Sequence, residues 1–324
     1  MGFDAGNTDG GLDPDSSCAV GTDEAKEVPV NMYIMFDKSY SMLGPKWSQT
    51  TAALQSFFMD PESAGLWMAL SFFPHPACAE SDCNIQSCSH PQVPLGELTN
   101  LSAPTDTHEQ ALIDSFIDVT PSGDTPLSAA LEGAVLWAQT HLQSHPYDKA
   151  VVVLVTDGVP TDCNEDHNYI IQKAQEAAGS GVLTFAIGLE GSSESLMNGI
   201  ANAGGTGQGI FVGTANAEQE LVAALNSIRE STIACEYQLP ETIEGQEVDP
   251  EEVNVLYTPQ GTGDPITIGQ VPSVSDCTDE LGGWYYNDPL APTSIIFCPS
   301  TCDAIRTDLD AEIELVIGCE TIPA

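Results

Sequence analysis

Residues 30–42 read VNMYIMFDKSYSM, and this stretch decides the fold. It opens with a predominantly apolar run, short enough for one buried β-strand, and Asp37 follows that run directly. Residues 151–158, VVVLVTDG, repeat the pattern with a more uniformly apolar run that leads to Asp157. In an open α/β sheet, ligands bind at the carboxyl ends of the strands. We therefore expect both aspartates to lie at strand ends and to take part in ligand binding.

Three hydroxyl side chains accompany these two carboxylates. The first loop has the spacing Asp-x-Ser-x-Ser, and alternate residues of a tight loop can turn toward a common point. A third hydroxyl comes from the turn PSGDTP at residues 121–126. Oxygen ligands without sulfur or imidazole suit Mg²⁺, Ca²⁺ or Mn²⁺. The predicted ligands of one divalent cation, with Mg²⁺ ranked ahead of Ca²⁺ and Mn²⁺, are Asp37, Ser39, Ser41, Thr125 and Asp157.

These elements together resemble a known family. An Asp-x-Ser-x-Ser loop after an apolar strand, a Gly-x-Thr-Pro turn, and Thr-Asp-Gly after a second apolar strand are similar to the von Willebrand factor type A domain, over residues 28–231. The resemblance implies a Rossmann-like fold whose metal-ion-dependent adhesion site falls on the five residues named above. In that family the hydroxyls touch the metal directly, while the aspartates bind it directly or through water. The alternative is an A domain that binds no metal.

Predicted strands and helices alternate along this region, which indicates a doubly wound, mostly parallel α/β sheet with helices on both faces. Strands are predicted at residues 32–36, 66–73, 150–156, 182–189 and 210–212. Helices are predicted near residues 47–59, 107–119, 127–141, 169–178, 193–203 and 218–228. A loop rich in cysteine, proline and histidine is predicted between residues 74 and 94.

The amino-acid composition and the predicted secondary structure change on either side of this domain. Residues 1–27 are acidic and rich in Asp and Gly, and we interpret them as a linker. Residues 232–324 contain short β-type runs divided by Pro, Gly and Asp, which predicts a small, disulfide-stapled β-rich domain. The block GGWYYNDP at 282–289 and the segment FCPSTC at 297–302 resemble the tails of secreted A-domain proteins from myxobacteria.

Ten cysteines are spread through both halves, and an even number favours up to five disulfides. We therefore expect a secreted or cell-surface protein. The first 17 residues are polar and contain no signal peptide, so we expect a mature or trimmed chain. No stretch approaches the roughly 20 apolar residues that would span a bilayer.

The cysteine pairing is open at this stage. Cys78, Cys83, Cys88 and His90 could form a zinc cluster, but their spacing fits no tight zinc knuckle. Disulfides are favoured, with Cys163 as one partner. Five cysteines in the tail leave one over, so Cys18 is a candidate to reach it. The tail cysteines are Cys235, Cys277, Cys298, Cys302 and Cys319.

The charge balance excludes two classes of partner. Acidic residues number 48 and basic residues 7, which gives a net charge of −41. Such a surface repels nucleic acid and anionic membranes. Two interpretations of the acidity are open: a protein adapted to seawater, brine or abundant divalent cations, or an acidic secreted protein that charge keeps soluble.

Two functions are consistent with these observations. The first is an extracellular adhesion module that captures a carboxylate of a partner protein through the bound cation. The alternative is a structural subunit of an extracellular matrix or filament, in which the cation is a local staple and the β-rich tail makes the contacts through self-association. We expect no enzyme, because neither a Gly-x-Ser-x-Gly elbow nor a histidine with catalytic spacing is present.

Overall fold

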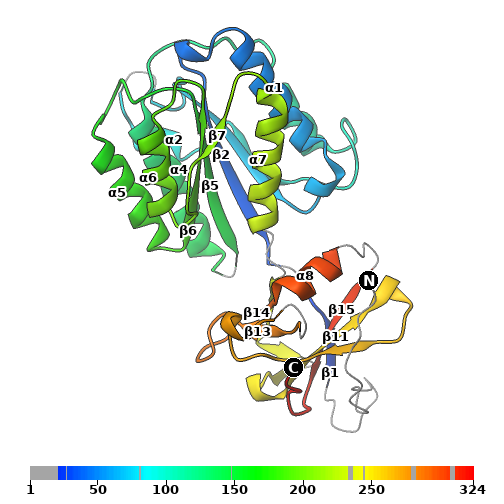
Figure 1. Ribbon diagram of the computed structural model, residues 1–324. Coiled ribbons are helices and arrows are strands. Elements are labelled where there is room, and N and C mark those ends of the chain that lie inside the picture. The colour runs from blue at the N-terminus through cyan, green and yellow to red at the C-terminus, as the bar shows by residue number, and fades with distance from the viewer. Residues whose placement is uncertain are drawn as a thin grey trace. The chain divides into compact units, whose positions relative to one another are not determined.

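The structure is a computed structural model that divides the chain into two compact units (Figure 1). One unit is Pro29–Thr232, and the other combines Met1–Val28 with Ile233–Ala324. The described residues are 21–26, 28–79, 82–146, 148–232, 236–243, 245–278, 282–306 and 311–324.

The first unit is built on a six-stranded sheet with the order β4-β3-β2-β5-β6-β7. Its strands are β2 (Val30–Asp37), β3 (Trp67–Phe73), β4 (Val93–Glu97), β5 (Lys149–Thr156), β6 (Val182–Leu189) and β7 (Ile210–Val212). All neighbours pair in parallel except β4, which runs antiparallel to β3 at the edge. All of β2 and nearly all of β5 is buried, as expected for central parallel strands covered on both faces.

Helices cover both faces of this sheet (Figure 1). They are α1 (Pro45–Phe58), α2 (Ile85–Cys88), α3 (Thr107–Asp114), α4 (Leu127–Ser144), α5 (His167–Ala178), α6 (Glu194–Ala203) and α7 (Ala217–Thr232). Helices α1, α3 and α7 pack on one face, while α2, α4, α5 and α6 pack on the other. The doubly wound, mostly parallel α/β architecture is therefore confirmed.

Alternating residues of β2 supply both cores. Tyr33 and Met35 point into the cluster beneath α4, α5 and α6. Phe36 faces the opposite side, where its ring stacks on Trp47 of α1 at a centroid distance of 5.2 Å. Phe116 closes the same aromatic cluster, with its ring edge-on to that of Phe36 at a centroid distance of 6.2 Å. These contacts place the end of β2, and hence Asp37, between two packed layers.

The predicted loop at residues 74–94 was only partly correct. It contains the short helix α2 and leads into β4, whose strand signal is weak because Pro94 and Gly96 interrupt it. Gly96 has a packing reason, since a Cβ there would lie 2.5 Å from Nδ1 of His108. An antiparallel edge strand tolerates such residues because one side of its backbone needs no partner.

The second unit is β-rich, as predicted. Its strands are β1 (Gly21–Glu24), β8 (Glu236–Gln238), β9 (Thr242–Ile243), β10 (Gln246–Glu247), β11 (Val253–Thr258), β12 (Ile266–Ile268), β13 (Trp284–Tyr286), β14 (Ser294–Phe297) and β15 (Glu312–Ile317). They form antiparallel sheets with the orders β1-β15-β11-β12, β13-β14-β8 and β10-β9. The short helix α8 (Pro299–Arg306) joins β14 to the segment before β15.

One aromatic side chain organises the core of this unit. Trp284 is fully buried, and the centroid of its ring lies 5.0 Å from that of the Tyr286 ring. Its indole N–H donates to the carbonyl of Ile268 at 2.9 Å, so the buried nitrogen is satisfied. Phe297 packs into the same cluster from β14.

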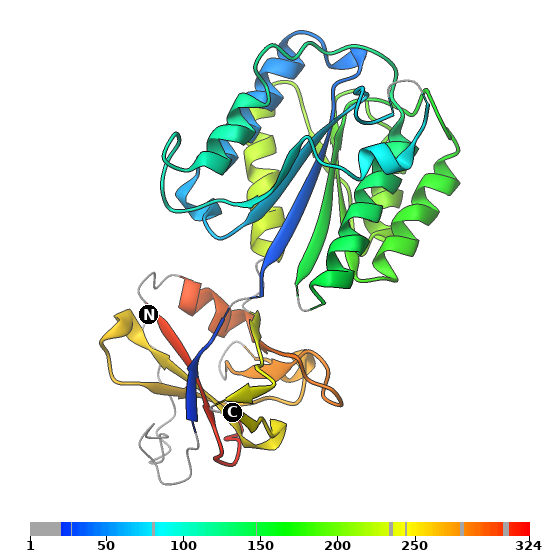
Figure 2. The same cartoon turned by 180° about the vertical axis from the view of Figure 1, so that it is seen from behind.

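The prediction that residues 1–27 form a linker is wrong for residues 21–24. These residues are strand β1, which pairs antiparallel with β15 near the end of the chain (Figure 2). The sequence GTDE has no apolar alternation, because β1 is a half-exposed edge strand held by backbone hydrogen bonds. The rest of the predicted linker up to residue 20 lies outside the described residues.

Disulfides replace the alternative of a zinc cluster. Cys78 pairs with Cys88, and Cys83 pairs with Cys163, so the predicted role of Cys163 is confirmed. In the second unit Cys277 pairs with Cys298, and Cys302 and Cys319 are also disulfide-bonded. The predicted reach of Cys18 lies outside the described residues, as does Cys235.

No helix within the described ranges is long and apolar enough to cross a membrane.

Replacing Cys83 and Cys163 together by alanine should destabilise the first unit. The bridge closes a loop of 80 residues, so we expect the free energy of unfolding to fall by about 2–4 kcal/mol. Urea unfolding followed by fluorescence measures this change. The double alanine variant of Cys277 and Cys298 is the control, and it should leave the unfolding of the first unit unaltered. An unchanged urea midpoint in the first variant would contradict the expectation.

Candidate metal site

The predicted site lies at the carboxyl edge of the central sheet. Strands β2 and β5 are parallel neighbours with Phe36 opposite Val155, so Asp37 and Asp157 leave the sheet at the same edge. Both aspartates are almost fully buried, at 0% and 2% exposure. The register of two strands therefore brings together carboxylates that are 120 positions apart.

The turn that carries Thr125 is tied to the first loop by backbone hydrogen bonds. The N–H of Ser122 donates to the carbonyl of Lys38 at 2.7 Å, and the N–H of Tyr40 donates to that of Gly123 at 3.0 Å. Thr161 ties the same turn to the loop after β5, because its hydroxyl accepts from the N–H of Thr125 at 3.0 Å. Three loops from distant parts of the sequence are thus fixed against one another.

The hydroxyls form a chain of contacts that ends at the second carboxylate. Ser39 Oγ lies 2.9 Å from Ser41 Oγ, and Ser41 Oγ donates to Asp157 Oδ1 at 2.7 Å. Ser39 also donates its backbone N–H to Asp37 Oδ1 at 2.7 Å. Ser39 is buried whereas Ser41 is exposed, so the chain runs from the interior to solvent.

Thr125 completes the set, and Gly158 is needed to leave room for it. A Cβ at Gly158 would lie 3.0 Å from Thr125 Oγ1 and 3.7 Å from Ser41 Oγ. Gly191 makes a similar close approach, since a Cβ there would lie 2.7 Å from the carbonyl oxygen of Asp157. A side chain at position 158 would crowd the Thr125 hydroxyl, and one at position 191 would clash with the backbone carbonyl of Asp157.

Asp37 is held by a residue that the sequence analysis did not single out. Thr156 Oγ1, on the last residue of β5, donates to Asp37 Oδ2 at 2.5 Å. Burial raises the pKa of Asp37 to about 6, and the charge of Asp157 adds to the rise, while hydrogen bonds from Thr156 and Ser39 oppose it. Two carboxylates in one buried place are mutually unfavourable, and a bound dication would relieve that repulsion.

Lys46 is a second residue that the sequence analysis missed. Its ammonium forms an ion pair with Asp157 Oδ2 and donates to the carbonyl of Glu190 at 2.8 Å. The Asp157 side chain is fully buried, whereas Lys46 remains 23% exposed. A signal was available, because Lys46 is one of 7 basic residues in the chain and lies only five positions after Ser41.

The donor chemistry fits a hard divalent cation. All five predicted residues come together, and each offers an oxygen: two carboxylates and three hydroxyls. Ser39, Ser41, Thr125 and Asp157 line one pocket of about 370 Å³ that opens to solvent. That these residues hold a cation stays a prediction. When bound, the cation would supply a positive centre able to take an anionic oxygen from outside.

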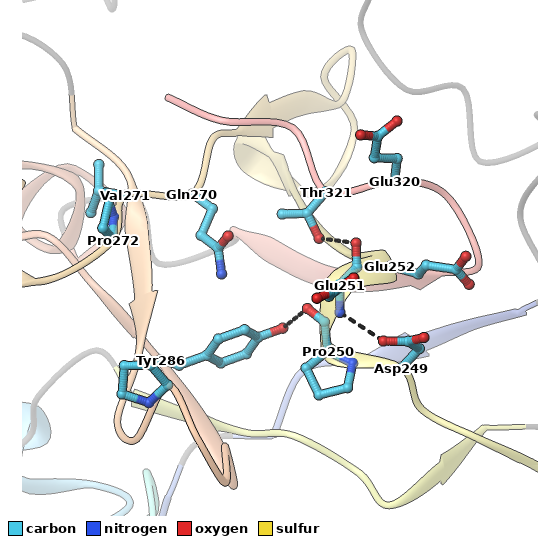
Figure 3. A pocket seen from close by; sticks show the side chains of 11 residues that line it. Asp249, Pro250, Glu251, Glu252, Gln270, Val271, Pro272, Tyr286, Glu320 and Thr321 are labelled. Atoms are coloured by element: carbon cyan, nitrogen blue, oxygen red, sulfur yellow. Dashed lines mark hydrogen bonds between the residues drawn. The ribbon is translucent and has the colours of Figure 1, made fainter.

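A larger cavity, about 700 Å³, lies in the second unit (Figure 3). Its lining carries several carboxylates, but those of Glu252 and Glu320 point in different directions rather than toward a common point. Tyr286 donates its hydroxyl to the carbonyl of Pro250 at 2.9 Å, and Glu251 donates its N–H to Asp249 at 2.9 Å. These contacts shape a hydrogen-bonded corner of the fold, not a set of converging ligands.

Comparison with known proteins identifies the family of the first unit. Residues 85–226 match the family model of the von Willebrand factor type A domain. The unit Pro29–Thr232 therefore holds a von Willebrand factor type A domain. No curated protein matches the chain in sequence.

Several solved structures are similar to the chain. The pilus adhesin SpaC from Lactobacillus rhamnosus GG is 14% identical over 94% of this chain and 42% of its own, with a TM-score of 0.48. The von Willebrand factor domain of a type V pilus tip protein from Porphyromonas gingivalis is 13% identical over 67% of this chain and 99% of its own, with a TM-score of 0.41. Proximal thread matrix protein 1 from the mussel byssus, solved with zinc in its adhesion site, is 16% identical over 67% of this chain and 50% of its own, with a TM-score of 0.41. The chain thus spans half or less of the adhesin and of the thread protein.

Replacing Lys46 by methionine should tighten divalent cation binding. The ammonium competes with a dication for Asp157, so its removal should increase cation affinity roughly tenfold, as measured by calorimetric titration of the chelator-stripped protein. The same variant should lower the melting temperature of the metal-free protein, because Asp157 loses its counter-charge.

Lys173→Met is the matched control, since it removes an ammonium of similar exposure, 26%, from an ion pair on α5. It should change neither property appreciably. Weaker cation binding by Lys46→Met would show instead that Lys46 orients Asp157 as a ligand.

In the metal-free protein, the contribution of Asp37 to stability should fall as the pH rises from about 4 to about 6. Because the pKa of Asp37 is about 6 in the folded protein and about 3.9 when unfolded, the folded state retains the proton longer. This group therefore contributes stability below pH 4 that is lost on ionisation, at most about 3 kcal/mol.

Urea unfolding of the metal-free wild type and of Asp37→Asn across this pH range isolates the effect from that of the other carboxylates. The difference in unfolding free energy between the two proteins should shift by that amount. Parallel pH profiles would contradict the assignment.

Proposed function

We propose that the A domain is a metal-dependent protein-binding module, in which a carboxylate of a partner protein completes the coordination of a divalent cation. The observation that carries the proposal is the composition of the open pocket. Three of the five predicted ligands are neutral hydroxyls, and of the two predicted carboxylates only Asp157 lines the pocket, which Asp124 and Lys46 also line. Such a cation retains affinity for one more anionic oxygen, which a partner carboxylate can provide.

The rim of the pocket supports a protein as the partner. Tyr40 and Val159 line it and remain exposed, at 70% and 44%. Leu43 follows in the same loop and is 40% exposed. Exposed apolar side chains around a polar centre are typical of protein interaction sites, where aromatic residues contribute much of the binding energy. Small anions would gain nothing from these side chains, whereas a protein surface would cover them.

Binding, not catalysis, is the function that we propose. The described residues that line this pocket include no histidine and no cysteine. Asp37 is buried behind Ser39 and is occupied by hydrogen bonds from Thr156 and Ser39, so it is poorly placed as a general base for an external substrate. We place the protein outside the cytoplasm, since disulfides connect loops in both units.

The proposal can be tested with a small carboxylate before any partner is known. In chelator-stripped protein loaded with Mn²⁺, water proton relaxation reports the water bound to the cation. Glutarate should displace that water, whereas the uncharged glutaramide should not. Thr125→Ala should weaken Mn²⁺ binding by at least about tenfold through loss of a ligand, while Thr140→Ala, on the exposed face of α4, should not.

Partner capture from the extracellular milieu should then require the cation and should fail for Asp37→Ala. Capture that is unchanged in excess chelator would refute the proposal. Self-association that persists in Thr125→Ala would favour the alternative, a structural subunit assembled through its β-rich unit.

A further inference from the structure

A column of aromatic rings runs down the end of α4, away from the oxygen-lined pocket. Trp137, His141 and His145 are spaced four residues apart, which places them on one face of the helix. The rings of Trp137 and His141 stack with centroids 5.7 Å apart, and those of His141 and His145 stack at 4.3 Å. His145 is the residue at which the helix ends. Two imidazoles thereby lie stacked beside each other.

A carboxylate joins these imidazoles from the start of β5. Asp148 Oδ2 lies 2.9 Å from His141 Nε2 and accepts a hydrogen bond from Asn31 Nδ2 at 3.0 Å. Asn31 is 2% exposed and also donates to the carbonyl of Lys149 at 3.1 Å, so its position is fixed. A buried amide therefore orients the carboxylate, as outer-shell groups do around metal ligands.

These three side chains have the ligand atoms and the spacing of a metal site. One nitrogen from each of His141 and His145 and one oxygen from Asp148 all lie within 4.8 Å of one another. We propose that they bind a divalent transition cation of the Zn²⁺ or Cu²⁺ class. A tetrahedral ion about 2.0–2.2 Å from each ligand would draw them together by roughly 1 Å, which a rotation of the exposed His145 allows.

The chemistry and the place of this site separate it from the oxygen-lined pocket. Two imidazoles and one carboxylate favour Zn²⁺ or Cu²⁺, whereas hydroxyls and carboxylates favour Mg²⁺ or Ca²⁺. Asp148 precedes β5 and Asp157 follows it, so the eight-residue strand keeps the two sites about 25 Å apart. The three ligands leave a fourth position open, and the exposure of His145 places that position toward solvent.

A structural role without metal is the competing explanation. An imidazolium at the end of α4 would interact favourably with the helix dipole and with Asp148. That arrangement uses His141 and Asp148 but gives His145 no part in the contact with Asp148. The Nδ1 atom of His145 lies 3.2 Å from the carbonyl oxygen of His141 instead. The two explanations therefore differ in what the loss of His145 does to metal binding.

Copper(II) titration of the full, chelator-stripped chain in a large excess of Mg²⁺ distinguishes them. The Mg²⁺ occupies the hard-oxygen site, and electron paramagnetic resonance then shows hyperfine coupling to two imidazole nitrogens if the proposed site fills. Zn²⁺ should displace that signal. His145→Gln should weaken copper binding by at least about tenfold and leave coupling to a single nitrogen, whereas His90→Gln, which removes another exposed imidazole, should change nothing.

Tryptophan fluorescence gives a second measurement of copper binding. Bound Cu²⁺ should quench Trp137, and Trp137→Phe should remove that quenching while copper binding persists. The proposal is overturned if no copper signal couples to two nitrogens, or if His145→Gln and His90→Gln bind copper equally well. Asp37→Ala should retain the copper site while losing the Mg²⁺ site, so failure of one proposal is distinguishable from failure of the other.

Discussion

The register between β2 and β5 is the constraint on which the rest of the first unit depends. A shift of one residue would turn every side chain of β2 to the opposite face and would exchange the two cores. It would also move Asp37 away from the hydroxyl of Thr156. The site and the hydrophobic core are therefore specified by the same pairing. A sheet that buries both faces of its central strands holds that pairing strongly.

The large excess of acidic residues makes the few basic side chains important for the structure of the first unit. The chain has 48 acidic and 7 basic residues, so each basic side chain has many possible carboxylate partners. Two of the basic residues form ion pairs that connect separate elements of the first unit. Lys46 neutralises Asp157 at the edge of the sheet. Arg229, only 4% exposed, pairs with Asp60 at 3.5 Å and with Glu62 at 2.5 Å, so it ties α7 to the segment before β3.

Local patterns foretold the central strands of the first unit and the β-rich character of the second. Apolar runs such as residues 151–155 made the central strands visible, because a strand buried on both faces must be apolar throughout. Strands β1 and β4 were not predicted, because their sequences are not continuously apolar. Both lie at sheet edges, where backbone pairing holds the strand and the side chains are only partly buried. The histidine pair at 141 and 145 has a helical spacing that the sequence displays, but its carboxylate partner follows the helix and could not be assigned by spacing.

The sequence by itself determined which residue types stand at the ends of the central strands, and hence the oxygen chemistry of the candidate site. This follows because each motif is local, and apolar periodicity places it at a strand end. Only the tertiary structure decided that Thr156 and Lys46 contact the two carboxylates, that Cys83 pairs with Cys163, and that residues 21–24 pair with the last strand. Each of these is a contact between segments far apart in the chain, whose choice depends on how the sheets stack and not on any pattern within either segment.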